Sequence, residues 1–160
     1  MDLFGNEADA RDAYFSPDRK YRYWLSRIWD GRLPFVQFIG LNPSTANENT
    51  DDPTIRRIVS FAKDWGYGGF YMTNLFGFVS PYPDELMTCD DPIGDNNFWL
   101  KEVRSWCRDV VFCWGSFEVF GRDKEVTAMF PEATCFGLTK GGNPKHPLYL
   151  SKNTRPVNYK

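Results

Sequence analysis

The stretch FIGLNPST at residues 38–45 decides the fold that the sequence predicts. An apolar run over residues 35–39 ends in Gly40, and the Asn-Pro pair that follows is typical of a turn. A helix start comes next, so the chain passes from a buried strand through an exposed turn into a helix. Open α/β sheets bind ligands at the edge where strands end in this way. Asn42 is therefore the first candidate for a functional side chain, with an ordinary Asn-Pro turn as the alternative.

Length and charge limit the class of protein. The chain has 160 residues, which fits a single domain over residues 1–160. Nineteen basic and 21 acidic side chains give a formal charge of −2, so no overall attraction to nucleic acid is expected. The sequence lacks a run of about 18 apolar residues and lacks a secretory signal pattern at its start. We expect a cytoplasmic protein with no membrane partner.

The cysteines indicate neither a metal site nor a disulfide framework. The sequence has 4 cysteines, and none of them forms a Cys-x-x-Cys pair. Cys113 and Cys135 lie in apolar runs that are typical of reduced core residues. The spacing also excludes an iron–sulfur motif. We therefore expect no cofactor and no metal.

Four short apolar runs predict the central strands of a sheet. Val, Ile and aromatic residues dominate them, as in strands that are buried on both faces. A helix between the first two runs would make a strand, helix, strand unit, which forces a parallel pair. The predicted strands are residues 35–39, 70–75, 110–114 and 134–136.

Three helices are predicted between these strands. The first begins at Asp52-Pro53, a capping Asp followed by Pro at the first helical position, and ends at the glycines of residues 66–69. The second covers residues 95–107, and the third covers residues 117–130 with Ser116 as its cap. The inward residues that the spacing predicts are Ile55, Ile58, Val59 and Ala62 in the first helix, and Leu100, Val103, Trp106 and Cys107 in the second.

The remaining segments are less regular. Residues 1–20 are polar, and we expect a loosely ordered arm or an edge element. Residues 21–29 predict an edge strand that pairs with the strand of residues 35–39 through a turn at Asp30-Gly31. Residues 76–93 form a long Pro-rich and Asp-rich loop, and loops of that length tend to be functional or mobile. The tail, residues 137–160, has no period.

These elements predict an α/β fold with three layers, α/β/α, around a four-stranded and mostly parallel central sheet. Parallel strands end at the same edge, so Asn42, Asn74 and Gly115 should lie close together. The tail leaves the last strand on that side as well. The sequence therefore predicts a pocket at this edge of the sheet.

The residues expected at this edge suit the recognition of a nucleobase. Asn42 and Asn74 each offer two amide donors and one acceptor, which can position a water molecule or pair with a base edge. His146, the single histidine, can donate a hydrogen bond to an oxygen that gains negative charge as a glycosidic bond breaks. The alternative is that His146 is a surface residue without a functional role.

The same residues carry a resemblance to a known superfamily. GLNPS at residues 40–44 resembles the first motif of the uracil-DNA glycosylase superfamily, and residues His146-Pro147-Leu148 resemble its closing His-Pro-Ser motif. The resemblance implies a fold of the uracil-DNA-glycosylase type. It implies that Asn42 positions or activates the attacking water, Asn74 reads the flipped base, and His146 stabilises the departing base anion. Ser44 and Leu148 depart from the superfamily's glycine and serine.

A closer resemblance covers residues 21–156. The segments LNPSTA, DDPT, NLF, GDN and GNPKHPLYL are similar to an uncharacterised bacterial and phage family known as a domain of unknown function. That family implies no activity.

Base and phosphate contacts follow from the same expected pocket. We expect Leu41, Ser44, Asn74 and Phe76 to bind the base. The basic residues around His146 could form a local phosphate site, although a solvated tail would carry the same residues. The lysines of this predicted phosphate site are Lys140, Lys145 and Lys152.

Three hypotheses about function remain open. The first is a metal-independent N-glycosidase that acts on a pyrimidine base in DNA or in a nucleotide. The second is a non-catalytic module that binds nucleic acid, a nucleotide or a protein in the same pocket, with Phe76, Phe78 or Trp114 as stacking surfaces. The third is a metal-dependent enzyme whose carboxylates are Glu48, Asp51, Asp52, Asp90 and Asp91.

Overall fold

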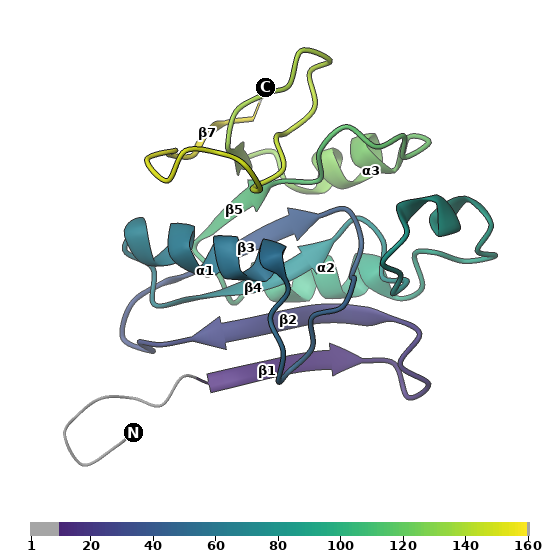
Figure 1. Cartoon of the computed structure of the whole chain (residues 1–160), viewed down its shortest axis with the longest axis horizontal. Coiled ribbons are helices and arrows are strands. Elements are labelled where there is room, and N and C mark those ends of the chain that lie inside the picture. The colour runs from purple at the N-terminus through teal and green to yellow at the C-terminus, as the bar shows by residue number, and fades with distance from the viewer. Residues whose placement is uncertain (1–9, 160) are drawn as a thin grey trace.

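The computed structural model describes residues 10–159 and contains one seven-stranded sheet with helices on both faces (Figure 1). The strand order is β1-β2-β4-β3-β5-β6-β7. The strands are β1 Ala10–Phe15, β2 Arg22–Ile28, β3 Phe35–Gly40, β4 Gly69–Asn74, β5 Asp109–Phe112, β6 Thr134–Cys135 and β7 Val157–Asn158. The helices are α1 Pro53–Asp64, α2 Asn96–Arg104 and α3 Arg122–Met129, with a 3₁₀ helix, η1, over Pro83–Met87.

The four predicted strands form the centre of this sheet. β4, β3, β5 and β6 are adjacent and pair in parallel. The sheet is larger than the four predicted central strands, because β1 and β2 extend one side and β7 extends the other, all by antiparallel pairing. Of these three, β2 corresponds to the strand predicted over residues 21–29. β1 lies in the polar segment expected as an arm or edge element, and it is the edge strand. Residues 1–9 of that segment lie outside the described residues.

The predicted partner of β2 was wrong. β2 pairs with β4, from Leu25 opposite Met72 to Ile28 opposite Gly69, and not with β3. The reason is that β3 is already paired on both sides, with β4 and β5. β2 is also not an edge strand, because β1 covers its other side.

One face of the sheet is covered by α1. Asp52 caps this helix, since its Oδ1 accepts a hydrogen bond from the Ile55 amide at 2.8 Å, as its sequence predicted. Ile55, Ile58 and Ala62 are buried, whereas Val59 is half-buried. They pack with Val36 and Phe38 of β3 and with other residues of the first core.

The other face carries α2 and α3 and a second core. Ile39 of β3 joins this core together with Leu100 and Val103 of α2 and Val126 of α3. Alternate residues of one strand therefore enter two separate cores, which confirms the three-layer α/β/α arrangement (Figure 1). Across residues 10–159, no helix combines the length and the apolar character that crossing a membrane requires.

Two helix boundaries differ from the prediction. α3 begins at Arg122 and not at residue 117, so Ser116 caps no helix. The cause is local backbone geometry, because Phe120 and Gly121 have φ angles of 53° and 85°, which a right-handed helix excludes. α2 ends at Arg104, which leaves Trp106 beyond the helix and 37% exposed, not inward.

Candidate functional site

A pocket of about 250 Å³ lies at the carboxyl ends of β3, β4 and β5. Gly40 and Asn74 end two of these strands, and Cys113 and Trp114 directly follow the third. The long loop after β4 adds Ser80, Pro81 and Pro83, and the tail adds His146. The pocket therefore collects residues from position 22 to position 146 at the edge where the sequence predicted it. Asn42, Asn74 and His146 all line it.

Asn42 is held by the loop opposite it. Its Nδ2 donates to the carbonyl oxygens of Pro43 at 3.0 Å and Ser80 at 2.9 Å. The Ser80 amide in turn donates to the Pro43 carbonyl at 2.9 Å. The Asn42 Oδ1 accepts from no donor among residues 10–159. The amide orientation is thus fixed by its nitrogen, and its oxygen is the atom available to a water molecule or a ligand.

Asn74 presents an unsatisfied donor in the pocket wall. Its side chain is 2% exposed, and its Nδ2 has no hydrogen-bond partner within the described part of the chain. Buried amide donors are normally paired, because an unpaired one costs about 1–3 kcal/mol. Asn96 fixes the backbone at this point, since its Nδ2 donates to the Asn74 carbonyl at 2.6 Å. A ligand carbonyl could supply the missing acceptor.

Gly40 allows the close approach of Asn74 to β3. A Cβ at Gly40 would lie 2.8 Å from the Asn74 Oδ1 and 2.6 Å from the Met72 Cε. Neither distance is compatible with a side chain at this position unless its neighbours shift. A side chain at position 40 would therefore displace the ends of the Met72 and Asn74 side chains, which line the pocket.

The ring of His146 is oriented by a backbone hydrogen bond. Its Nδ1 accepts a hydrogen bond from the Leu148 amide at 3.2 Å, so the neutral ring carries its proton on Nε2. Burial lowers the pKa of His146, and the negative charge of Asp52 opposes that shift only in part. The Gly115 amide donates to the Pro144 carbonyl at 2.9 Å, which anchors this part of the tail to the end of β5. The imidazole ring of His146, which lines the pocket, is therefore fixed in orientation.

Arg22 also lines the pocket, and the sequence analysis missed it. Its side chain is 3% exposed, its Nη1 donates to the Ala46 carbonyl at 2.9 Å, and its Nε has no partner in the described chain. Burial lowers the pKa of Arg22 to about 10, although the charge of Asp52 acts in the opposite direction. The guanidinium is still charged at neutral pH.

A β-bulge explains why Arg22 reaches the pocket. Trp24 pairs with Tyr14 and Arg22 pairs with Phe15, so Tyr23 is an extra residue between two consecutive pairs. Tyr23 stacks on Trp99 of α2 with ring centroids 6.5 Å apart, whereas Arg22 faces the α1 side. The sequence signal for this bulge is that residues 21–24 do not keep a strict alternation of polar and apolar side chains.

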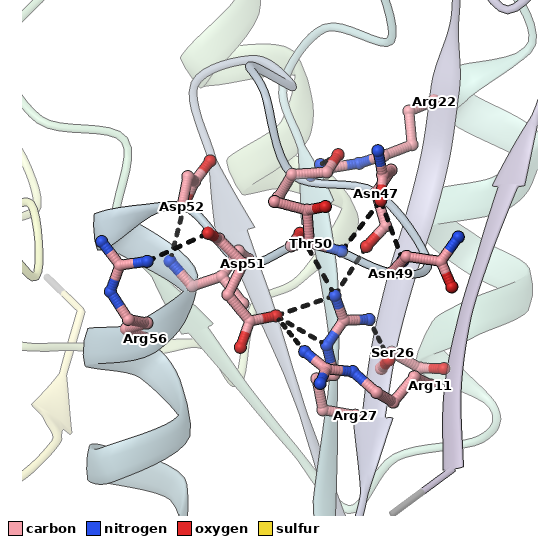
Figure 2. Close-up of polar contacts among 12 residues, drawn as sticks. Arg11, Arg22, Ser26, Arg27, Asn47, Asn49, Thr50, Asp51, Asp52 and Arg56 are labelled. Carbon is pink, nitrogen blue, oxygen red and sulfur yellow. Dashed lines mark hydrogen bonds and ion pairs between the residues drawn. The ribbon is translucent and has the colours of Figure 1, made fainter.

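Asp52 is the second residue that the analysis did not place in the pocket. Its neighbour Asp51 is directed to a different cluster, in which Arg27 and Arg11 contact the same Asp51 oxygen at 2.8 Å and 2.7 Å (Figure 2). Burial raises the pKa of Asp51, but the hydrogen bonds from the two arginines outweigh it, and the net shift is downward. Arg27 also donates to the Asn47 carbonyl at 2.6 Å. This cluster fixes residues 44–52, which we call the clamped loop.

The predicted base-binding residues divide between two pockets. Leu41 and Ser44 line the 250 Å³ pocket with Asn74. Phe76 is 7% exposed and lines a separate, mainly apolar pocket of about 300 Å³ that includes Phe117. Trp114 lies in the first pocket, where its Nε1 is buried without a partner among residues 10–159.

The predicted phosphate-binding lysines do not come together at the pocket. Lys152 lines a different pocket beside Asp64 and Trp65, at the carboxyl end of α1, whereas the amino end of α1 lines the first. The Lys145 side chain lies along Gly137. Lys140 is exposed in the turn closed by the Leu138–Pro144 bridge.

The carboxylates of the metal hypothesis are also dispersed. Glu48 pairs with Arg19 at 3.2 Å, and Asp51 pairs with arginines. The Asp91 Oδ1 accepts from the backbone amides of Ile93 and Gly94. Within residues 10–159, no group of three or more His, Cys, Asp or Glu side chains is arranged to hold a metal ion.

Comparison with known proteins identifies a family but no function. The family described as "Protein of unknown function (DUF1643)" matches residues 22–148. The chain belongs to the DUF1643 family. This match confirms the resemblance to a domain of unknown function, and it covers every residue that lines the 250 Å³ pocket. A search of curated proteins and a search of solved structures each found no similar protein.

Proposed function

We propose that this DUF1643 protein recognises a pyrimidine base, in DNA or in a nucleotide, and hydrolyses the N-glycosidic bond between base and sugar. The observation that carries the proposal is that Asn42, Asn74 and His146 line one pocket at the ends of parallel strands. The same trio supports a resemblance to the uracil-DNA glycosylase superfamily. A volume of about 250 Å³ favours a single base, because pockets for drug-sized ligands measure about 300–1,000 Å³.

Each member of the trio would act through one defined atom. The unpaired Nδ2 of Asn74 would donate to a carbonyl oxygen of the base. The free Oδ1 of Asn42 would accept a hydrogen bond from the attacking water and hold it toward C1′. The Nε2–H of His146 would donate to the base oxygen that gains negative charge as the C1′–N bond breaks. A neutral histidine serves this purpose because its Nε2 already carries the proton that the hydrogen bond requires.

Charge bears on the form of the substrate. The net charge is −2, and none of the three predicted phosphate-binding lysines lines the pocket. Enzymes that scan DNA obtain most of their non-specific affinity from phosphate contacts. A nucleotide is therefore included in the proposal beside DNA, and a base in duplex DNA would have to be flipped out.

The test is release of free base. Purified protein would be incubated without added metal with oligonucleotides and nucleotides that carry uracil, mismatched thymine or 5-substituted pyrimidines. We expect release that falls about 10²–10³-fold in Asn42→Ala and His146→Gln. Asn153→Ala, at an exposed position outside the pocket, should match the wild type.

Two results would contradict the proposal. One is full activity in both pocket variants, and the other is no release from any substrate in the panel. Specific binding of an unaltered substrate would support a non-catalytic binding module instead. The hydrogen bonds of the Asn42 Nδ2 to two backbone carbonyls are compatible with that alternative, because they also give Asn42 a structural task.

A further inference from the structure

We infer that Asp52 is a catalytic carboxylate of this pocket in addition to capping α1. The inference rests on the proposed hydrolysis of a glycosidic bond. Asp52 is the acidic side chain among the residues that line the pocket, where it is grouped with Asn42 and His146. From the sequence, Asp52 was predicted only as a helix cap and as one carboxylate of the metal hypothesis.

The two oxygens of Asp52 have different environments. Oδ1 accepts a hydrogen bond from the Ile55 amide at 2.8 Å and so holds the carboxylate in one orientation. Oδ2 accepts from no donor in the described part of the chain. Figure 2 shows that Asp52 points away from the arginines that surround Asp51. One oxygen is therefore structural, and the other is available for chemistry.

Asp52 is placed to act on the other polar groups of the pocket. It lies at the amino end of α1, where the helix dipole stabilises negative charge. Its charge also acts on both ionisable neighbours, because it opposes the downward pKa shifts of Arg22 and His146. The clamped loop ends at Asp52, so the Arg27–Asp51 ion pair fixes the backbone immediately before it.

The proposed reaction lacks a base without Asp52. An amide such as Asn42 can orient a water molecule but cannot accept its proton at neutral pH. Arg22 is charged, and His146 is assigned as a donor. A carboxylate can take the proton, and its negative charge also stabilises the positive charge that develops on the sugar ring.

In the proposed step, water replaces the base at C1′. The water oxygen forms a bond to C1′ while the C1′–N bond breaks and its electron pair leaves with the base. One water proton moves to the Asp52 Oδ2, and the second stays on the new hydroxyl group of the sugar. The base anion, held by the His146 N–H, then takes the proton from Asp52, which restores the carboxylate.

Substitutions at Asp52 can separate capping from catalysis. Asn and Ser cap helices about as well as Asp does, so Asp52→Asn and Asp52→Ser should fold and melt like the wild type. We expect both variants to release base about 10²–10⁴-fold more slowly. Their affinity for the free base, measured by calorimetry, should stay near the wild-type value. Glu48→Gln removes the same charge from the clamped loop at a surface ion pair and should retain full activity.

Chemical rescue adds a readout that a structural role would not affect. Gly is also tolerated as a cap and leaves space at residue 52, so added formate should restore part of the activity of Asp52→Gly but not that of His146→Gln. Activity of Asp52→Asn within about threefold of an active wild type would overturn the inference and leave the proposed function intact. A wild type that releases no base would overturn both.

Discussion

Replacing Asp51 with Asn should leave the guanidinium of Arg27 buried beside a neutral side chain. The Arg27 side chain is 4% exposed and that of Asp51 is 23% exposed. In the wild type, the Arg27 Nε and Nη2 contact the Asp51 Oδ1 at 2.9 Å and 2.8 Å. The substitution conserves size and removes the charge, so any loss of stability reports on the ion pairs of Asp51 with the buried Arg27 and with the exposed Arg11.

The burial of Arg27 and Asp51 sets the loss of stability that we expect for Asp51→Asn. Removing one member of a buried ion pair costs about 3–5 kcal/mol, whereas an exposed pair contributes about 0.2–1 kcal/mol. Asp51 is nearly a quarter exposed, and Arg27 keeps the Ser26 and Asn47 carbonyls as acceptors at 2.8 Å and 2.6 Å. We therefore expect a loss of about 2–3 kcal/mol. For a domain of this size, that corresponds to a decrease in Tm of roughly 4–12 °C.

Urea unfolding measures this loss directly, and Glu48→Gln is the matched control. Glu48 lies in the same clamped loop, but its pair with Arg19 is exposed, with side-chain exposures of 34% and 54%. The control should lose less than about 1 kcal/mol. Unchanged m-values in both variants would show that the denatured states are comparable.

The pH dependence gives a second check. Because the pKa of Asp51 is lowered from 3.8 in the folded state, its stabilisation is present above that value and is lost as the pH falls through the folded pKa. The difference between the wild type and Asp51→Asn should therefore disappear in acid. A loss within about 0.5 kcal/mol of that of the control, or a difference that persists in acid, would refute the reasoning.

Three further predictions concern single positions. Gly68→Ala should destabilise the chain by about 3 kcal/mol in urea unfolding, because its Cβ would lie 1.9 Å from the Asp30 carbonyl oxygen; wild-type stability would contradict this geometry. Leu100→Ala should cost about 2–5 kcal/mol, since Leu100 is 0% exposed in the second core; a cost below that of a surface substitution would show that this core is loosely packed. His146 should titrate below 6.5 by NMR, and stability should fall as the pH is lowered from 6.5 toward that folded pKa, because the unfolded chain binds the proton more readily. His146→Gln should remove this slope, and a slope that persists would assign it to other groups.

The centre of the fold was predictable because its signals are local. The run at residues 35–39 is apolar except for Gln37, which fits a strand that enters two cores. The start of α1 is predictable from two adjacent residues, because Asp52 is a helix cap and Pro53 is at the first helical position. The prediction that strand ends would bring Asn42 and Asn74 together followed from parallel pairing alone.

The remaining features depend on long-range packing. β7 has two residues, and its strand pairing is to the distant β6. Phe120 has a left-handed backbone conformation, and α3 begins only after it. The sequence does not predict this conformation, because Phe rarely adopts it and glycine is its usual marker. Arg22 reads as an exposed strand residue in the sequence, and only the pairing of β1 with β2 turns it toward the pocket. Charged residues in buried positions are the hardest to predict from composition because their partners are distant.

The bulge at Tyr23 decides which face of the sheet receives the guanidinium of Arg22. Side-chain direction in a strand repeats every two residues, so one extra residue reverses the direction of every side chain before it. Deleting Tyr23 would restore regular alternation and leave Arg22 opposite Phe15 on the α1 side, so the pocket would keep its positive charge while the ring that stacks on Trp99 would be lost. Regularising the strand with Tyr23 still present would instead pair Tyr23 with Phe15 and turn Arg22 toward the α2 face. A one-residue deletion at this bulge is therefore compatible with an unchanged pocket, whereas a change in its pairing is not.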